Sequence, residues 1–346
     1  MTEAKQLDMR PVLAISMGDP TGIGPEILVR SLQANETYEI CRPLAVGSVS
    51  AIRRIAEILG ADVKVTAAHP ESATYETGTI EVFDPWEEDL SRLPFKQISV
   101  EAGRASAEAV IAAARLVMDG QAAALVTGPI QKEAINKAGY HYAGHTELLA
   151  DLTDSPGARM LLAAPQLRVI HNSTHVSLRE AIDRVTKDNV LHCIRLLGEA
   201  LQLMGFENPR IAVNGLNPHA GEDRLFGNED ADEIQPAIEA ARAEGLTVEG
   251  PVPGDTVYNK AIDGQYDGIV AMYHDQGHVA VKLAGFFDGV NVTLGLPIIR
   301  TSVDHGTAFG RAGEGRARED SLNAAIKLAT EMARTQATTP PAGAPA

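Results

Sequence analysis

The sequence predicts a three-layer α/β/α fold, because short apolar segments typical of buried strands alternate with longer amphipathic segments typical of helices. Residues 11–17 (PVLAISM) indicate a first strand, and residues 102–119 indicate a long amphipathic helix. The turn after the first strand leads into a helix that begins near Pro25, since proline is favoured in a first helical turn. A chain of 346 residues is long enough to bury a sizeable core in this architecture.

The same alternation continues along the rest of the chain. Further strands are expected at 43–48, 79–84, 122–129, 291–296 and 297–303, and at three segments that end near histidines; further helices are expected at 50–59, 187–204, 231–244, 275–284 and 319–334. We expect residues 1–128 and 300–335 to form a first lobe and residues 129–299 a second. Residues 336–346 are rich in Pro and Ala, which predicts a disordered tail.

Composition excludes several classes of partner. The net charge of −16 and an aromatic content of 4% leave no basic stripe or stacking platform for nucleic acid. Two cysteines, Cys41 and Cys193, without a CxxC motif predict neither a disulfide framework nor a cysteine-based zinc site. The N-terminus is unlike a signal peptide, and no apolar run has the length of a membrane span. We therefore expect an enzyme of the reducing cytoplasm without a membrane partner.

Three histidines share one local context. His175, His219 and His274 each lie at or just past the end of a short segment rich in Val, Ile and Ala. In a parallel α/β sheet such strand ends gather along one edge, where ligands usually bind. Three imidazoles that meet there can hold one divalent metal and leave positions open for a substrate, as in a catalytic site. Separations of 44 and 55 residues exclude a zinc finger.

The ordinary interpretation of such a histidine is a loop residue or a hydrogen-bonded core group. Three histidines in matched contexts, close to Asn217, Asp275 and Gln276, leave two interpretations open: a metal site, or loop and core residues. The histidine pairs four residues apart at 141/145 and 171/175 are not helical zinc motifs, because a loop or strand end does not place such residues on one face. Of the seven other histidines we expect only His145 in the site.

Two further regions favour an anionic ligand. His145 and Thr146 lie at the predicted start of a helix, where free amides attract anions, although Thr146 alone suits an ordinary cap. Lys282, Asn291 and Arg300 lie near predicted element ends within one short region. Because Lys and Arg are natural partners of phosphate and carboxylate, this cluster suggests a small substrate that carries both groups.

Two glycine-rich loops do not match a dinucleotide fingerprint. In Gly18–Glu26 the third glycine of GxGxxG is replaced, since Gly22 and Gly24 are followed by Ile27. These glycines suit a tight turn beside a ligand. The second loop, Asp304–Gly313, fits either a simple turn or a nucleotide clamp.

The chain resembles the 4-hydroxythreonine-4-phosphate dehydrogenase (PdxA) family. The resemblance runs in order from about residue 11 to 315 and is carried by GDPTGIGPE, VTGPIQKEAI, GHTELLA, NSTH, GLNPHAGE, GDTVY, AMYHDQG and GVNVTLGLPIIRTSVDHGTA. It implies a fold like that of isocitrate and isopropylmalate dehydrogenases, with two lobes and a cleft between them. It also implies NAD bound through loops other than a Rossmann turn, and a homodimer with its site near an interface on the second lobe.

The resemblance also implies roles for individual residues. One divalent metal per subunit (Zn, Co, Ni, Mn or Mg) would be held by His175, His219 and His274. Substrate-binding residues would be His145, Thr146, Lys282, Asn291 and Arg300, and cofactor-binding residues would be Asp304, His305, Gly306 and Thr307. The general base is left open among Asp255, Asp275 and Lys282.

Within the family, HYAGHTELLA, STHVSLREAI, LFGNED and YHDQGHVAVKL resemble the branch that acts on 4-phospho-D-threonate or 4-phospho-D-erythronate. That branch implies NAD-dependent oxidation of a C3 hydroxyl and β-decarboxylation to dihydroxyacetone phosphate. Phe309, Gly310 and Arg311 stand where the family has an apolar residue, Asp and Ile, which leaves NAD against NADP open; we favour NAD. Alternatives are the 4-hydroxythreonine-4-phosphate dehydrogenase of pyridoxal phosphate biosynthesis, a metal-dependent hydrolase and a non-catalytic sugar-phosphate binding protein.

Overall fold

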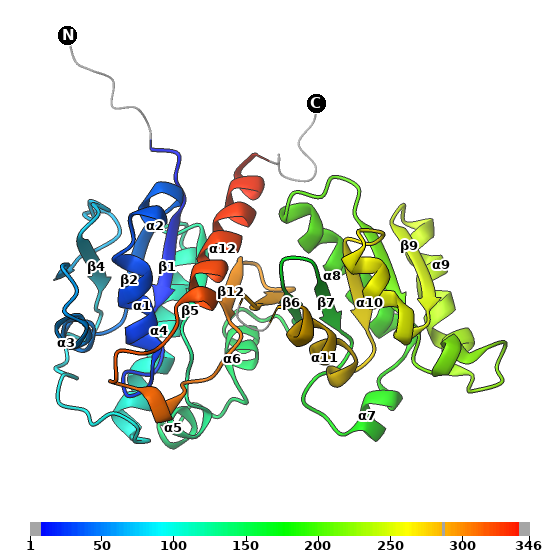
Figure 1. Cartoon of the computed structure of the whole chain (residues 1–346), viewed down its shortest axis with the longest axis horizontal. Helices are drawn as coiled ribbons and strands as arrows, with labels where there is room; N and C mark the ends of the chain where they lie inside the picture. The colour runs from blue at the N-terminus through cyan, green and yellow to red at the C-terminus, as the bar shows by residue number, and fades with distance from the viewer. Residues whose placement is uncertain (1–7, 286–287, 339–346) are drawn as a thin grey trace, which may run out of the picture. The chain divides into compact units, whose positions relative to one another are not determined.

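The computed structural model describes residues 8–285 and 288–338 (Figure 1). The chain divides into two compact units: unit 1 comprises Met1–Tyr142 and His305–Arg334, and unit 2 comprises Ala143–Asp304 and Thr335–Ala346. These boundaries differ from the expected ones at 128/129 and 299/300. Helix α5 (Lys132–Lys137) packs against α4 (Val100–Met118) and so extends unit 1. Strand β12 (Arg300–Val303) pairs with β11 (Val290–Leu294) and so remains in unit 2.

Unit 1 is built on a parallel sheet. Its strands lie in the order β3-β4-β2-β1-β5, and each neighbouring pair is parallel. In strand β1, between β2 and β5, Leu13, Ala14 and Ile15 are fully buried, as a continuous apolar run predicts. The strands are β1 (Val12–Ser16), β2 (Arg42–Val46), β3 (Lys64–Ala67), β4 (Thr79–Phe83) and β5 (Ala124–Thr127); the further helices are α1 (Gly24–Leu32), α2 (Asn35–Ile40), α3 (Val49–Leu59), the short η3 (Phe309–Arg311) and α12 (Asp320–Thr338).

Unit 2 carries a mixed sheet in the order β12-β11-β6-β7-β10-β8-β9. Strands β7, β10, β8 and β9 are parallel, whereas β6 and β11 are antiparallel to their neighbours. Short connections between β6 and β7 and between β11 and β12 permit only antiparallel pairing. The further strands are β6 (Arg159–Ala163), β7 (Arg168–His171), β8 (Arg210–Asn214), β9 (Thr247–Val252) and β10 (Gly268–Ala271), and the helices are α6 (His145–Leu152), α7 (Leu178–Asp183), α8 (Lys187–Leu203), η1 (Pro218–Gly221), η2 (Asp230–Ile234), α9 (Gln235–Ala243), α10 (Gly254–Ile262) and α11 (His274–Ala284).

The α/β class predicted from the alternation is confirmed, with corrections in detail. The last helix continues to Thr338, so residues 336–338 are helical and only the part of the predicted tail from 339 onward lies outside the described residues. The short elements α2, β3, α5, β6, α7, β9 and α10 were not expected, because four to nine residues carry too little periodicity to stand out. Among the described residues, no helix combines the length and apolarity that a membrane crossing requires.

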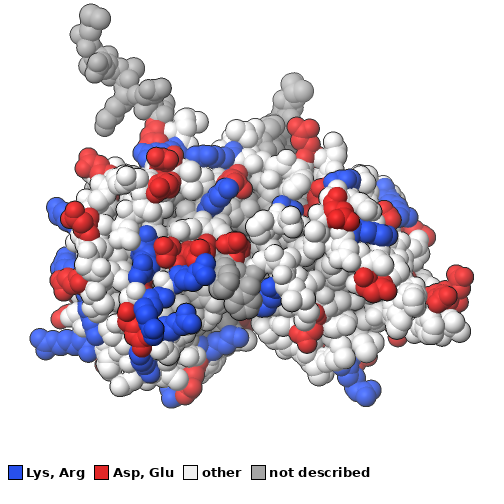
Figure 2. Space-filling view, viewed as in Figure 1, with Lys and Arg blue, Asp and Glu red and all other residues white. Residues whose placement is uncertain are grey.

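Acidic and basic side chains of the described residues are interspersed on the face shown in Figure 2. Some of them form surface ion pairs, such as Lys96–Glu314 at 2.5 Å and Arg195–Glu244 at 2.5 Å. Exposed pairs of this kind contribute little to stability. Their alternation does, however, break up the continuous positive surface that a nucleic-acid polymer would need.

Candidate functional site

The three histidines of matched context lie at one edge of the unit 2 sheet. Strand β10 lies between β7 and β8 in parallel register, so the carboxyl ends of all three point the same way. His175 follows β7 by four residues, and His274 is the first residue of α11, which follows β10. His219 lies in η1, beyond the end of β8. The structure therefore places all three histidines beyond the carboxyl ends of parallel strands, as expected.

His175 and His274 face a common cavity. Their ring centroids are 5.8 Å apart, and both line a cavity of about 580 Å³ between the β7–α7 loop and the start of α11. The Nδ1 atom of His274 lies 2.7 Å from a carboxylate oxygen of Asp275. Metal-binding histidines commonly bond one ring nitrogen to a carboxylate and bind the ion with the other. The donor set at this cavity therefore fits a divalent metal that accepts imidazole nitrogen.

His219 does not join that pair in the described structure. Among residues 8–285 and 288–338, no group of three or more His, Cys, Asp or Glu side chains is placed to hold one ion. The ring of His219 instead faces Phe226, at 6.1 Å between centroids. Every residue from His219 to Arg224 has a positive φ, between 38° and 80°, a left-handed run that is costly for non-glycine residues.

Asp230 holds the base of this left-handed run. Its buried carboxylate accepts hydrogen bonds from the backbone N–H of Leu216 at 2.8 Å and of Asn217 at 3.1 Å. The Nδ2 atom of Asn217 donates to the same carboxylate at 2.9 Å. Asn217 thus supports the segment that carries His219.

Two histidines that the sequence interpretation set aside lie beside His274. The ring of His278 stacks on that of His274, with centroids 3.6 Å apart and an interplanar angle of 11°. His171, at the end of β7, has its Nε2 3.1 Å from Nδ1 of His278. The expectation that only His145 accompanies the three histidines is therefore incomplete. The missed signal is the spacing of His274, His278 and Lys282, which places all three on one face of α11.

These two additional histidines are neutral at neutral pH. Burial lowers the pKa of His171 to about 3, and the neighbouring His278 adds to the effect. Burial likewise lowers the pKa of His278 to about 4, with His274 contributing and Asp304 acting in the opposite direction. Neutral imidazoles offer one donor and one acceptor each, which suits a hydrogen-bonded network.

Lys282 completes this face of α11. Its Nζ lies 2.7 Å from a carboxylate oxygen of Asp304, which follows β12. Asp304 was expected among the cofactor-binding residues, but in the structure it pairs with a predicted substrate-binding lysine. The two other candidate bases lie in the first turns of helices: Asp255 is exposed in α10, and Asp275 is exposed in α11 beside His274.

A second predicted substrate residue, Arg300, has a buried guanidinium. Arg300 is 2% exposed in β12, and its Nη1 donates to Thr293 Oγ1 at 2.8 Å. Burial lowers the pKa of Arg300 to about 9, whereas the negative charge of Glu147, in the first turn of α6, acts to raise it. His145 and Thr146 begin that same helix, whose N-cap residue makes no side-chain cap hydrogen bond. A helix start of this kind is a favourable place for an anion.

Asn291 lies on the neighbouring strand. It is opposite Ser302 of β12 in the β11–β12 ladder, and its Nδ2 lies 2.9 Å from the sulfur of Met160. Its buried Oδ1 has no hydrogen-bond partner among the described residues. A buried amide oxygen of this kind can accept a hydrogen bond from a ligand hydroxyl.

The first glycine-rich loop and residues 305–313 of the second lie together in unit 1. The backbone N–H of Ile23 donates to the carbonyl of Thr307 at 3.0 Å. A Cβ at Gly22 would lie 2.9 Å from Cβ of Thr307, so glycine permits this close contact. The buried Nε2 of His305 has no hydrogen-bond partner among the described residues, and a Cβ at Gly306 would meet open space. Three of the four predicted cofactor residues thus form a loop with an available polar atom.

Comparison with known proteins identifies the family. Residues 39–329 match the family described as "Pyridoxal phosphate biosynthetic protein PdxA". The chain belongs to the PdxA family. It is therefore a dehydrogenase, an oxidoreductase that acts on a CH–OH group.

Individual PdxA relatives are similar over nearly their whole length. The D-threonate 4-phosphate dehydrogenase of Pectobacterium atrosepticum is 45% identical over 330 residues, covering 94% of this chain and 100% of that protein. The 4-hydroxythreonine-4-phosphate dehydrogenase of Geobacter metallireducens is 46% identical over 332 residues, covering 94% and 97%. The crystal structure of 4-hydroxythreonine-4-phosphate dehydrogenase from Klebsiella pneumoniae matches with a TM-score of 0.86 and 41% identity, covering 93% and 99%.

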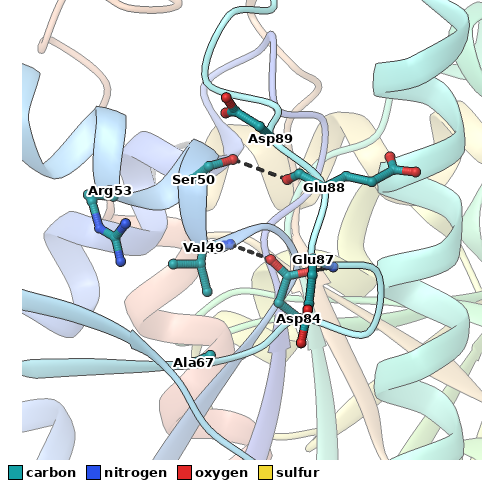
Figure 3. Close-up of a pocket in the computed structure, with 8 residues that line it drawn as sticks. All are labelled: Val49, Ser50, Arg53, Ala67, Asp84, Glu87, Glu88 and Asp89. Atoms are coloured by element: carbon teal, nitrogen blue, oxygen red, sulfur yellow. Dashed lines mark hydrogen bonds between the residues drawn. The ribbon is translucent and has the colours of Figure 1, made fainter.

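This PdxA-family chain has another cavity, of about 290 Å³, in unit 1 (Figure 3). It lies beside the start of α3 and is rich in carboxylates, of which those of Asp84, Glu88 and Asp89 have partners within the chain. The carboxylate of Asp84 accepts from the N–H of Val49 at 2.8 Å, and Ser50 donates to the carbonyl of Glu88 at 3.2 Å. Asp84 thus satisfies an amide of the first helical turn, and we assign the cavity no ligand.

Proposed function

We propose that this PdxA-family dehydrogenase oxidises the C3 hydroxyl of 4-phospho-D-threonate or 4-phospho-D-erythronate and releases dihydroxyacetone phosphate after β-decarboxylation. The observation that carries the proposal is the imidazole pair of His175 and His274 beside one cavity. Lys282 lies on the same face of α11 as His274. Imidazoles suit a metal near a hydroxyl, and the cation suits an acidic substrate. The similarity to D-threonate 4-phosphate dehydrogenase favours this substrate class.

Each group of residues has a defined task in this proposal. His175, His219 and His274 would hold one divalent ion, which when bound supplies Lewis acidity toward the C3 oxygen. Lys282 and Arg300 would neutralise the phosphate and carboxylate, and the first amides of α6 would add hydrogen bonds. Asn291 offers its Oδ1 to a substrate hydroxyl.

The chemistry divides into two balanced steps. The C3 hydride passes to NAD and the hydroxyl proton passes to a base, for which Asp255, Asp275 and Lys282 are the candidates. The resulting β-keto acid then breaks its bond to the carboxylate; CO₂ leaves, the electron pair remains on the enolate, and a proton at carbon gives dihydroxyacetone phosphate. We place NAD at the loop of residues 304–307, where His305 offers a buried ring nitrogen.

An assay of purified protein with NAD and a panel of substrates tests the function. We expect NADH to form with 4-phospho-D-threonate or 4-phospho-D-erythronate, and we expect slower turnover when NADP replaces NAD. The kcat/KM for 4-hydroxythreonine 4-phosphate should be at least about tenfold lower. A chelator should stop the reaction and added divalent metal should restore it. Phosphate release without NADH would instead favour a metal-dependent hydrolase, and undiminished turnover after chelation would remove the metal from the mechanism.

Exposed apolar side chains in unit 2 support a homodimer. Leu178 of α7 is 60% exposed and Leu283 of α11 is 84% exposed, and both helices border the cavity of His175 and His274. An apolar surface beside a candidate site is typical of an interface. It would also place a second copy of the chain near that cavity. Among the described residues of one chain, His219 does not join His175 and His274 there.

Light scattering measures this association. The wild-type protein should show about twice the chain mass of 36.7 kDa. Leu178→Glu combined with Leu283→Glu should shift it toward the monomer, because charged side chains are costly at an apolar interface core. Met118→Glu, on the exposed end of α4 in unit 1, is the matched control. A monomeric wild-type protein would disprove the dimer.

A further inference from the structure

We propose that His278 and His171 form a positioning pair that fixes the imidazole of His274 for metal binding. The proposal rests on the proposed function, in which His274 is a ligand. Neither residue belongs to the predicted ligand set, and both lie behind His274 as seen from the cavity that His274 lines.

The first argument is the ring stack. His274 and His278 are one helical turn apart on α11, and their rings are nearly parallel, with centroids 3.6 Å apart. On another side, Nδ1 of His274 is bonded to Asp275 at 2.7 Å. Because one face and one nitrogen are engaged, rotation of the His274 ring is restricted and its Nε2 is the nitrogen available to an ion.

Hydrogen bonds fix the stacking partner in turn. Nδ1 of His278 lies 3.1 Å from the carbonyl oxygen of His274 and 3.1 Å from Nε2 of His171. A carbonyl oxygen only accepts, so Nδ1 of His278 carries the proton and donates. Nε2 of His171 is then the second acceptor of the same proton, in a bifurcated hydrogen bond. This assignment sets one tautomer for each ring and one orientation for His278.

Close packing brings the pair together. His171 is fully buried and His278 is 8% exposed. A Cβ at Gly277 would lie 2.3 Å from Nε2 of His171 and 2.8 Å from Val169, so the absence of a side chain there lets α11 lie against β7. The segment is therefore shaped to accommodate the two rings.

The chemistry of the buried pair distinguishes positioning from ordinary packing. Two polar rings in the interior need hydrogen-bond partners. Nδ1 of His278 satisfies Nε2 of His171, whereas Nδ1 of His171 has no partner among the described residues. Two apolar side chains of similar size would fill the space without that requirement. A packing role alone would therefore be served at least as well by leucines. The imidazole pair adds what leucines lack, a directional hydrogen bond and a flat ring face against His274.

Metal affinity of the chain, measured without substrate or NAD, tests the proposal. Apo protein competes with a chromophoric chelator for Zn²⁺, and the visible spectrum of the Co²⁺ form reports ligand geometry. His278→Leu, which removes the stack and the bonds, should weaken Zn²⁺ binding about 10- to 100-fold and alter the Co²⁺ spectrum. His278→Phe keeps a ring face, so its Zn²⁺ affinity should lie between those of His278→Leu and the wild type. His278→Asn keeps a donor near the Nδ1 position and should recover most of the affinity.

His192→Leu is the matched control. His192 is another helical histidine of unit 2, and its ring nitrogen bonds the carbonyl of Gly157 at 2.8 Å, away from the cavity. The His192→Leu variant should leave Zn²⁺ affinity unchanged. If His278→Leu does not fold by circular dichroism, the His171→Leu/His278→Leu double variant, an apolar pair, and His278→Phe carry the measurement.

A thermodynamic cycle with His274→Ala separates action through His274 from general destabilisation. In that background His278→Leu should cause no further loss of Zn²⁺ affinity. Equal affinities of wild type, His278→Leu and the double variant would overturn the positioning role while leaving the proposed function standing, as would a full additional loss in the His274→Ala background. A wild-type protein that neither binds metal nor reduces NAD would overturn both.

Discussion

The His219→Ala protein is expected to lose metal-dependent oxidation by about a thousandfold or more while it remains folded. A metal ligand supports several kcal/mol of stabilisation of the developing charge, and each 1.4 kcal/mol corresponds to about a factor of ten in rate. His219 is exposed in a loop, so its truncation removes no core contact. The effect should therefore appear in activity and bound metal, with little change in Tm.

Metal content, NADH formation and thermal unfolding measure the His219→Ala effect together. His141→Ala, an exposed histidine of unit 1, is the control and should keep wild-type activity. If the wild type is sensitive to chelation but His219→Ala is fully active, His219 leaves the ligand set. That outcome would agree with its separation from His175 and His274 in the single chain.

The sequence predicts the parts of the fold that depend on local pattern. The buried run of β1 and the strand β10 before His274 are visible because both are continuous apolar segments that end in polar loops. The antiparallel placement of β6 and β11 was not predicted, since apolar runs do not reveal which neighbour a strand pairs with. Class and element positions are thus local properties, whereas sheet order depends on the tertiary fold.

The site shows the same division. The strand-end context selects His175 and His274, which the structure places at one cavity. His171 was missed because its partner, His278, is far along the chain and is reached only by packing α11 on β7. Periodicity on α11 could have found His278, had the helix face been followed beyond its first turn.

The left-handed run that carries His219 lies beyond local prediction. Of its six residues only Gly221 signals positive φ, and the others adopt it at a cost. The compensation comes from outside the run, through the Asp230 carboxylate and the Asn217 side chain. Strain of this kind is often found at functional segments, which agrees with the role proposed for His219.

Arg300→Met is expected to raise the KM for the phosphorylated substrate roughly 100-fold with a smaller change in kcat. A charge-assisted hydrogen-bonded pair contributes about 2 to 3 kcal/mol, and its loss weakens binding common to the ground and transition states. Methionine is used because Arg300 is 2% exposed in β12, and truncation to alanine would also leave a cavity. Steady-state kinetics with Tm as a control measure the effect. Arg300→Lys should recover part of the binding, since it keeps the charge but not the planar fork.

A substrate analogue without phosphate can identify which substrate group, the phosphate or the carboxylate, Arg300 contacts. If the guanidinium binds the phosphate, Arg300→Met and wild type should have the same kcat/KM for D-threonate; if it binds the carboxylate, the variant should lose the same factor on both substrates. The position of Arg300 near the start of α6, where Glu147 acts on its pKa, places two anion-binding features together and favours the phosphate. A loss in kcat alone, with KM unchanged for both substrates, would contradict a binding role and assign Arg300 to the chemical step.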